Sequence, residues 1–254
     1  MLKISPFALS MFNQCPRQYK FRYIDGLARQ YRKPWPWLTM GDNIHAALKD
    51  FLSAPVEHRT QETIETLLRK KWQRNRQGFA DEEEEKRWGE RALAQVRWFA
   101  QTQEVGLTPF LLEKWHEAPI REGHITLGGR IDRIDRLADG SVHVIDYKTG
   151  RMPENIDTFQ LLLYVLILLK TLPYPILKAS YLYLASGKWH TIEPNKYDLQ
   201  QAMERFLEMV YEIETEREYP ERVSSLCTFC DFLEICGMGQ EAGLTAPDRE
   251  PVDF

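Results

Sequence analysis

Residues 128–150 constrain the fold most, because they predict a β-hairpin that carries charged side chains. Asp139-Gly140 separates two runs rich in Ile and Val, which is a strong short-range signal for two antiparallel strands. In the second strand Asp146 and Lys148 are two residues apart, so their side chains project from the same face. Asp132, on the first strand, can lie across from them. The hairpin therefore predicts two carboxylates and an ammonium group at one place.

The chemistry that suits this arrangement is metal-assisted phosphodiester hydrolysis. Two neighbouring carboxylates repel each other unless a hard divalent cation bridges them, and Mg²⁺ or Mn²⁺ prefers oxygen ligands. The lysine can then orient or deprotonate the attacking water and offset charge on the phosphorus. Ile131 followed by Ile134 breaks the strand alternation beside Asp132, which predicts a bulge or twist there. An isolated Asp-x-Lys is more often ordinary surface charge, so the rest of the chain has to support this interpretation.

The spacing of these residues resembles a known family. Asp132, thirteen intervening residues and then Asp146-Tyr147-Lys148 are similar to the signature of the PD-(D/E)XK nuclease superfamily. The Gly-Arg-Ile-Asp lead-in and the Asp-Tyr-Lys-Thr-Gly close resemble its RecB-like exonuclease branch, in which Ile131 in place of proline is common. The resemblance extends from about Ser10 to about Cys236. It implies an α/β, restriction-endonuclease-like fold, a mixed β-sheet core flanked by helices, with Asp132, Asp146 and Lys148 as catalytic residues.

A second motif adds a histidine. A lone histidine at the border of the apolar stripe of residues 39–52 is most simply hydrogen-bonded to nearby backbone. However, Gly41-x-x-x-His45-x-x-Leu48 resembles the RecB-like helix whose histidine is a metal ligand, which implies a metal set of His45, Asp132, Asp146 and Tyr147. Glu113 lies where this branch often carries a glutamate. It could support a metal ligand or pair with Lys148, and an exposed strand glutamate is the simpler interpretation.

Two groups of residues are candidate DNA contacts. Gln160 and Tyr164 lie one turn apart on the apolar helix expected over 157–170, either as a satisfied core pair or, as the RecB-like resemblance implies, positioning the DNA strand. Near the N-terminus, basic side chains alternate with aromatic ones, and we expect Arg17 and Tyr19 to contact phosphates and unpaired bases. A solvated helix with a buried aromatic stripe explains any one of these N-terminal residues equally well.

The four cysteines suggest a second cofactor. Cys15 lies near the N-terminus, whereas Cys227, Cys230 and Cys236 are separated by two and then five residues. Without a secretory signal, thiolates that bind zinc or an iron-sulfur cluster are favoured over disulfides, and spacing alone leaves these two open. The one-plus-three pattern resembles the 4Fe-4S site of RecB-like exonucleases linked to CRISPR spacer acquisition and recombination. The resemblance implies that the cluster joins the N- and C-terminal segments.

Composition is that of an ordinary globular chain. The 254 residues are 43% hydrophobic and 28% charged with a net charge of -4, and no apolar run is long enough to span a bilayer. We expect a cytoplasmic, single-domain protein over 1–254, with a catalytic core at 38–195, helical and cluster-bearing regions at 1–37 and 196–240, and a tail at 241–254. Periodicity predicts helices over 4–23, broken near Pro16, and over 39–52, 60–77, 81–104 and 195–217, with a linker at 33–37. It predicts strands over 110–120 and 176–184, and then a turn at 187–188 before a short strand through Ile192.

The sequence therefore predicts a Mg²⁺- or Mn²⁺-dependent DNA exonuclease that acts on single-stranded ends in repair, recombination or CRISPR adaptation. The alternative is a non-catalytic DNA-binding scaffold, which would be expected to have lost Lys148 or an aspartate. No Gly-x-x-x-x-Gly-Lys-Ser/Thr phosphate loop is present, so unwinding would come from a partner helicase or a CRISPR-adaptation protein. Digestion polarity, preference for DNA over RNA, and oligomeric state stay open at this level.

Overall fold

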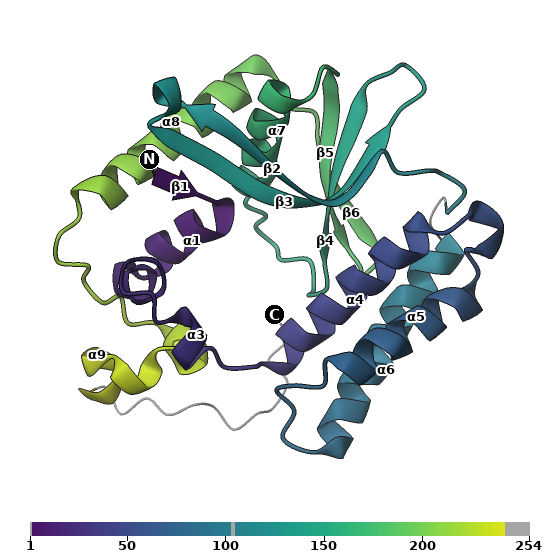
Figure 1. The fold of residues 1–254 in the computed structure, drawn as a ribbon, viewed down its shortest axis with the longest axis horizontal. Coiled ribbons are helices and arrows are strands. Elements are labelled where there is room, and N and C mark those ends of the chain that lie inside the picture. Colours follow the sequence, from purple (N-terminus) through teal and green to yellow (C-terminus); the bar gives the residue numbers. More distant parts are fainter. Residues whose placement is uncertain (1, 103–104, 242–254) are drawn as a thin grey trace.

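The computed structural model describes residues 2–102 and 105–241 (Figure 1). Its N-terminal elements are β1 Leu2–Ile4, α1 Pro6–Gln14, α2 Pro16–Tyr19, a π-helical turn Lys20–Ile24, α3 Ala28–Tyr31, α4 Pro36–Ser53, α5 Gln61–Arg74 and α6 Glu82–Thr102. They are followed by β2 Leu111–Ile120, β3 Ile125–Arg136, β4 Val142–Lys148, α7 Phe159–Thr171, β5 Ile176–Tyr183, β6 Lys188–Ile192, α8 Lys196–Thr215 and α9 Gly237–Glu241. Short 3₁₀ turns lie at Val56–His58, Arg121–Gly123, Ser225–Phe229 and Leu233–Ile235.

The strands form one mixed sheet in the order β1-β3-β4-β5-β6, with β2 paired to the other edge of β3. The β3–β4 hairpin is antiparallel, as the Asp-Gly turn predicts, and β4 pairs with β5 in parallel through the α7 crossover. This is the mixed α/β architecture that the sequence predicts. β1 was not predicted, because a strand of three residues has no period of its own and forms only by parallel pairing with β3.

Two hydrophobic cores cover the two faces of the sheet. One core packs α1, α7 and α8 against alternate β4 residues such as Val142 and Val144. The other packs α4, α5 and α6 against the intervening residues Ile145 and Tyr147. In Figure 1 the α4–α6 layer accordingly lies well apart from α7 and α8. Because the side chains of β4 alternate between the two cores, the end of this strand lies between two helical layers.

The predicted irregularity beside Asp132 is present in the packing of β3. Ile131 and Ile134 differ in parity, yet both belong to the core that contains α7. The ladder between β2 and β3 pairs Leu112 with Arg133 and Lys114 with Ile131, and it omits Glu113 opposite Asp132. Glu113 has a φ of 49°, an uncommon conformation for a residue with a side chain. The irregularity therefore falls on the partner strand, opposite the first aspartate of the hairpin.

The N- and C-terminal segments pack together. The rings of Phe21 and Phe232 lie 5.4 Å apart between centroids. Asp231 Oδ1 accepts a hydrogen bond from the backbone N–H of Lys33 at 3.0 Å, and Lys33 Nζ lies 3.0 Å from Glu234 Oε1. Figure 1 shows α3 beside α9, although the two helices are about 200 residues apart in the chain. These contacts hold the N-terminal helical segment against residues 231–234.

Local signals placed most helices to within a few residues, and Pro16 divides the first one. Cys15 is extended, with φ -159° and ψ 108°, so it ends α1 and Pro16 starts α2. The expected linker over 33–37 is shorter, because Pro36 begins α4, and the rings of Trp35 and Trp37 stack 4.8 Å apart. Within residues 2–102 and 105–241, no helix is both long and apolar enough to cross a membrane.

Arg59 fixes α4 relative to the chain that leads into β2. Its guanidinium donates hydrogen bonds to the carbonyls of Leu52, Ala54, Val105 and Leu107 at 2.6–2.9 Å, and the residue is buried. Hydrogen bonds from a charged donor are among the stronger ones, and their loss leaves buried carbonyls unpaired. This side chain therefore ties the end of α4 to the segment that leads into β2.

We expect Arg59→Met to lower the free energy of unfolding by roughly 3 kcal/mol, because several buried carbonyls lose their donor. Urea unfolding followed by circular dichroism measures this change. Arg69→Met is the matched control, since Arg69 is 62% exposed and makes a 3.8 Å helical pair with Glu65. Equal stability of the two variants would show that Arg59 does not hold these connections together.

Candidate functional site

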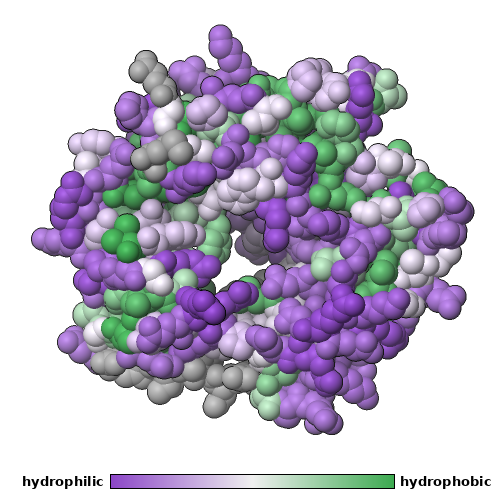
Figure 2. Space-filling view, viewed as in Figure 1, coloured by the Kyte–Doolittle hydropathy of each residue, from purple (hydrophilic) through white to green (hydrophobic). Residues whose placement is uncertain are grey.

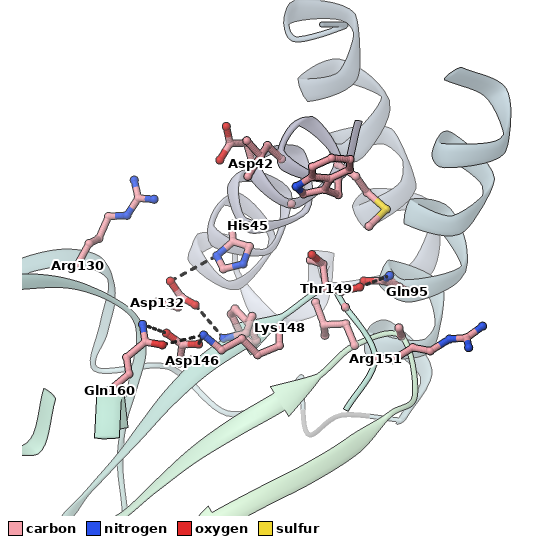
Figure 3. Close-up of a pocket in the computed structure, with 18 of the residues that line it drawn as sticks. Asp42, His45, Gln95, Arg130, Asp132, Asp146, Lys148, Thr149, Arg151 and Gln160 are labelled. Atoms are coloured by element: carbon pink, nitrogen blue, oxygen red, sulfur yellow. Dashed lines mark hydrogen bonds and ion pairs between the residues drawn. The ribbon is translucent and has the colours of Figure 1, made fainter. Parts of the chain in front are cut away.

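The site begins where β3 and β4 separate. The ladder between these strands ends with the pair Arg133 and Ile145. Beyond it, Asp132 Oδ2 accepts a hydrogen bond from the backbone N–H of Tyr147 at 2.8 Å. The carboxylate thus takes the place of a strand carbonyl and is held at a fixed position. Asp132 is itself buried, and its other oxygen faces α4 (Figure 3).

Three side chains from different elements form a group that could hold a metal ion. His45 from α4, Glu113 from β2 and Asp132 from β3 each offer one ligand atom, and these atoms lie within 4.8 Å of one another. His45 Nδ1 is 3.3 Å from Glu113 Oε1 and 3.3 Å from Asp132 Oδ1. Burial lowers the pKa of His45, but the Asp132 and Glu113 carboxylates outweigh it and raise the pKa to about 10. These two carboxylates therefore favour a cation at this place.

Asp146 and Lys148 form an ion pair next to this group. Lys148 Nζ lies 2.7 Å from Asp146 Oδ2 and donates a hydrogen bond to Gln160 Oε1 at 2.9 Å. Gln160 Nε2 donates to the Tyr164 hydroxyl at 2.9 Å and to Asp146 Oδ1 at 3.3 Å. Burial raises the pKa of Asp146 and the Asp132 charge adds to this effect, whereas the charge of Lys148 opposes it. Gln160 therefore fixes the lysine relative to the second carboxylate.

These groups lie at the floor of a cleft of about 1110 Å³. The sheet and α7 form one wall, and α4 and α6 form the other, to which α6 contributes Trp88, Arg91, Gln95 and Trp98. Figure 2 shows the molecule hollowed at its centre, between the sheet, the N-terminal helices and the α4–α6 layer. The size of the cleft exceeds that of a small-molecule pocket, so it suits a polymeric substrate.

Two consecutive glycines in β3 make room for aromatic side chains that line the cleft. A Cβ atom on Gly129 would lie 2.7 Å from Cε1 of Tyr164, and one on Gly128 would lie 2.7 Å from Cζ2 of Trp115. Such distances are too short for a carbon contact. The Gly-Gly-Arg-Ile-Asp segment is therefore required by packing, because its two glycines seat Tyr164 and Trp115 beside Asp132.

The structure brings together most of the residues predicted for the site. His45, Asp132, Asp146, Tyr147, Lys148, Gln160 and Tyr164 all line the cleft. The ring of Tyr147 is buried against Phe99, at 5.9 Å between centroids, so it is the main chain of Tyr147 that reaches Asp132. Glu113 corrects one expectation. Its side chain is only 9% exposed and contacts His45 and Arg130, so it is neither an exposed strand glutamate nor the partner of Lys148.

The two predicted N-terminal DNA contacts lie elsewhere. Tyr19 is 3% exposed and packs edge-on against Phe12 at 5.4 Å between ring centroids. Arg17 Nε lies 3.2 Å from Glu221 Oε1 and lines a second, small cavity away from the cleft. The alternation of basic and aromatic residues thus reflects packing between α2 and the C-terminal segment. Neither side chain is placed for the contact with DNA that was predicted.

All four cysteines line this second cavity. Cys15 follows α1, and the other three come from the turns between Ser224 and Gly237. Each is a free thiol of intermediate exposure. Burial raises the pKa of Cys230 to about 11, and the neighbouring Cys15 and Cys227 sulfurs add to this effect. In the part of the chain that the structure describes, no three of these sulfurs lie within 4.8 Å of one another.

Sequence reasoning missed the contribution of α6 and the placement of Glu113. Gln95 Nε2 donates to the carbonyl of Thr149 at 3.0 Å and thereby fixes the chain after β4, as Figure 3 shows. The helical period of 81–104 shows which residues share a side of α6 but not what that side meets. The Gly-Gly pair was a signal of the close aromatic packing, since adjacent glycines in a strand mark a close approach.

The fold and the site define a mixed α/β protein with a carboxylate-rich metal group beside a lysine. A model of the PD-(D/E)XK nuclease superfamily matches residues 3–237, and the chain therefore belongs to this superfamily of metal-dependent nucleases. No curated protein matches the chain. Among solved structures, the crystal structure of SSO0001 is similar, with 17% sequence identity, a TM-score of 0.48, and coverage of 93% of this chain and 86% of that chain.

We expect Gly129→Ala to slow phosphodiester cleavage about tenfold or more, because the new methyl group displaces Tyr164 and, through Gln160, Lys148. It should also lower the free energy of unfolding by roughly 1–3 kcal/mol, as overpacking does. Single-turnover cleavage and thermal unfolding measure the two effects. Gly106→Ala is the matched control, since nothing lies within 4 Å of its added Cβ. Wild-type cleavage by Gly129→Ala would contradict the role of Tyr164 in placing the lysine.

Proposed function

We propose that the protein is a metal-dependent deoxyribonuclease that degrades single-stranded DNA from a free end. The observation that carries this proposal is the placement of the His45–Glu113–Asp132 group within one cleft with Asp146, Lys148 and Gln160. A non-catalytic scaffold needs no ammonium group held between a buried carboxylate and a glutamine. The preserved contacts of Lys148 therefore favour catalysis over the scaffold alternative.

The donor set fits a divalent cation. Carboxylate oxygens and one imidazole are suitable ligands for Mg²⁺ or Mn²⁺, and the negative charges of Asp132 and Glu113 that raise the pKa of His45 also favour a bound cation. We assign His45, Asp132 and Asp146 as metal ligands together with the main chain of Tyr147, and Glu113 as a further candidate ligand. When bound, the cation supplies Lewis-acid stabilisation of the scissile phosphate.

Lys148 has the geometry to act on the nucleophile. An ammonium group has three N–H donors, and two of them are directed at Asp146 and Gln160. The third can hold the attacking water or a non-bridging phosphate oxygen. In hydrolysis the water oxygen bonds to phosphorus, the bond to the leaving nucleoside oxygen breaks, and the proton lost by the water ends on that leaving oxygen. Lys148 thus orients the water and offsets the charge of the transition state.

The walls of the cleft support a single strand as the substrate. They carry aromatic side chains, and unpaired bases stack on such rings whereas paired bases are shielded within a duplex. These residues are Phe7, Trp37, Trp98 and Trp115. Arg91, Arg130 and Arg151 also line the cleft and supply positive charge for the phosphates.

The enclosure of the cleft supports entry from an end. Helices α4 and α6 face the sheet and α7, and Phe7 of α1 contributes to the lining from a third direction. A strand threaded between three sets of elements enters most readily by its terminus.

The resemblance to RecB-like enzymes extends the proposal to a pathway and to partners. It supports a role in DNA repair, recombination or CRISPR adaptation, with a helicase or a CRISPR-adaptation protein as partner.

The decisive measurement compares a linear single strand, the same strand circularised, and a blunt duplex, each with Mn²⁺ or Mg²⁺. We expect the linear strand to be degraded fastest and the circle to be spared. Lys148→Ala should slow cleavage roughly 100-fold or more while DNA binding persists, and EDTA should act likewise. Lys188→Ala, an exposed lysine at the start of β6, is the control and should cleave normally. Rapid cleavage of the circle would refute an exonuclease, and full activity of Lys148→Ala would refute the site.

We also propose that Cys15, Cys227, Cys230 and Cys236 bind a 4Fe-4S cluster. All four cysteine side chains line one small cavity, which supports a single group bound by all four. The choice of an iron-sulfur cluster over zinc rests on the one-plus-three spacing, which resembles that of RecB-like exonucleases. The raised pKa of Cys230 means that a bound cation is needed to keep it as a thiolate.

Cys15→Ala should yield a protein that lacks the brown colour of an iron-sulfur cluster, contains less iron and unfolds at a lower temperature. The physical reason is that the cluster links α1 to the C-terminal segment and so restricts the unfolded chain. Absorbance, iron analysis and thermal unfolding measure these effects. The exposed neighbour Asn13 provides the control Asn13→Ala, which should keep cluster and stability. Anaerobically purified wild type that holds zinc and no iron would contradict the assignment.

A further inference from the structure

One of the aromatic side chains that line the cleft, Trp115, lies on the same strand as Glu113 of the metal group. Trp115, on the edge strand β2, is 55% exposed and lines the cleft. Large aromatic side chains are normally mostly buried, because each removes a large apolar area from water. The protein does not enclose Trp115 in this way. An indole kept exposed inside a substrate cleft needs an explanation beyond folding.

The indole is held in one orientation. One edge of the ring rests against Gly128, where a Cβ atom would lie 2.7 Å from Cζ2 of Trp115. At another edge, Nε1 donates a hydrogen bond to Glu117 Oε2 at 3.3 Å, and Lys3 Nζ lies 3.5 Å from the same oxygen. These contacts fix the ring plane while leaving more than half of the residue accessible. The arrangement is that of a preformed stacking surface.

A cation lies next to this surface. Arg130 is the cross-strand partner of Trp115, and its side chain is 62% exposed. Its Nε lies 3.0 Å from Glu113 Oε2, so the same arginine contacts the metal group. Figure 3 shows Arg130 on the side of the catalytic group opposite Arg151. Trp115 and Arg130 thus lie side by side on β2 and β3, next to the metal group.

Trp115 lies close to the metal group along β2. Glu113 and Trp115 are two residues apart, which along a strand is roughly 7 Å. A nucleotide whose phosphate lies at the metal group can therefore place its base, or that of its immediate neighbour, over this indole. An aromatic ring binds any base through its π-face, whereas the guanidinium can contact the adjoining phosphate.

We propose that Trp115 is a binding residue for an unpaired nucleobase next to the scissile phosphate, with Arg130 contacting the adjoining phosphate. This inference rests on the proposed nuclease function and specifies the substrate of the same cleft. It assigns Trp115 to strand recognition, without sequence preference, and gives it no part in the chemical step. A protein partner on the exposed indole is the competing occupant, and the closed position of Trp115 within the cleft argues against it.

The test measures binding in EDTA, so that no cleavage occurs, with short single-stranded oligonucleotides that carry 2-aminopurine at successive positions. We expect one position near the bound end to be quenched by stacking in the wild type. Trp115→Ala should lose this quenching and bind roughly tenfold more weakly, whereas Trp115→Phe should keep most of both. Trp189→Ala, a 38% exposed tryptophan that is not among the residues lining the cleft, is the matched control and should bind normally.

A further substrate separates base recognition from catalysis. With Mn²⁺, Trp115→Ala should cleave a strand that is abasic at the quenched position at the rate at which the wild type cleaves it, because neither protein then has a base to stack. An abasic residue at the quenched position should weaken wild-type binding to the level of Trp115→Ala. The role of Trp115 would be overturned if Trp115→Ala bound intact DNA as tightly as the wild type does. It would also be overturned if the substitution weakened binding of the abasic strand by the same factor as binding of the intact strand. Failure of wild-type protein to cleave any of these phosphodiesters would instead refute the proposed nuclease function.

Discussion

The carboxylate of Asp132 is the constraint on which the site depends. It lies at the fork between β3 and β4, where its Oδ2 replaces a ladder acceptor for the N–H of Tyr147 and its Oδ1 faces His45. A buried carboxylate is costly unless it is both hydrogen-bonded and paired with positive charge. The fork satisfies the first requirement by backbone geometry. The second is met by His45, and a metal ion held by the His45–Glu113–Asp132 group would add to it. The place where β3 and β4 separate is therefore also the place where the negative charge of Asp132 is held.

Glu113 joins this group through local backbone strain. A positive φ for a residue with a side chain costs on the order of 1–3 kcal/mol and persists only where its surroundings enforce it. Regular β2–β3 pairing on both sides of Glu113 supplies that enforcement. Arg130 then holds the carboxylate by a 3.0 Å contact. The strain brings a further carboxylate toward His45, so the edge strand contributes to the electrostatics of the site as well as to the sheet.

Local patterns predicted the parts of the site that are close in sequence. The Asp-Gly turn and the two-residue strand period place Asp146 beside Lys148, and the helical period places Gln160 beside Tyr164. In contrast, His45 and Glu113 are 68 residues apart and meet only because α4 packs across the sheet, which a motif alone does not establish. The same limit explains Tyr19. An aromatic stripe identifies one helix face, but burial against Phe12 shows that this face turns inward.

The two cores of the protein hold different halves of the site. Lys148, Gln160 and Tyr164 are positioned from the α7 side, whereas His45 comes from α4 in the core shared with α5 and α6. Gln95 connects the halves by donating to the carbonyl of Thr149, directly after Lys148. The distance between the lysine and the metal group is therefore set by how α4 and α6 pack on the sheet. Because close-packed cores transmit small displacements, a change deep in the α4–α6 core alters the metal group without touching any ligand.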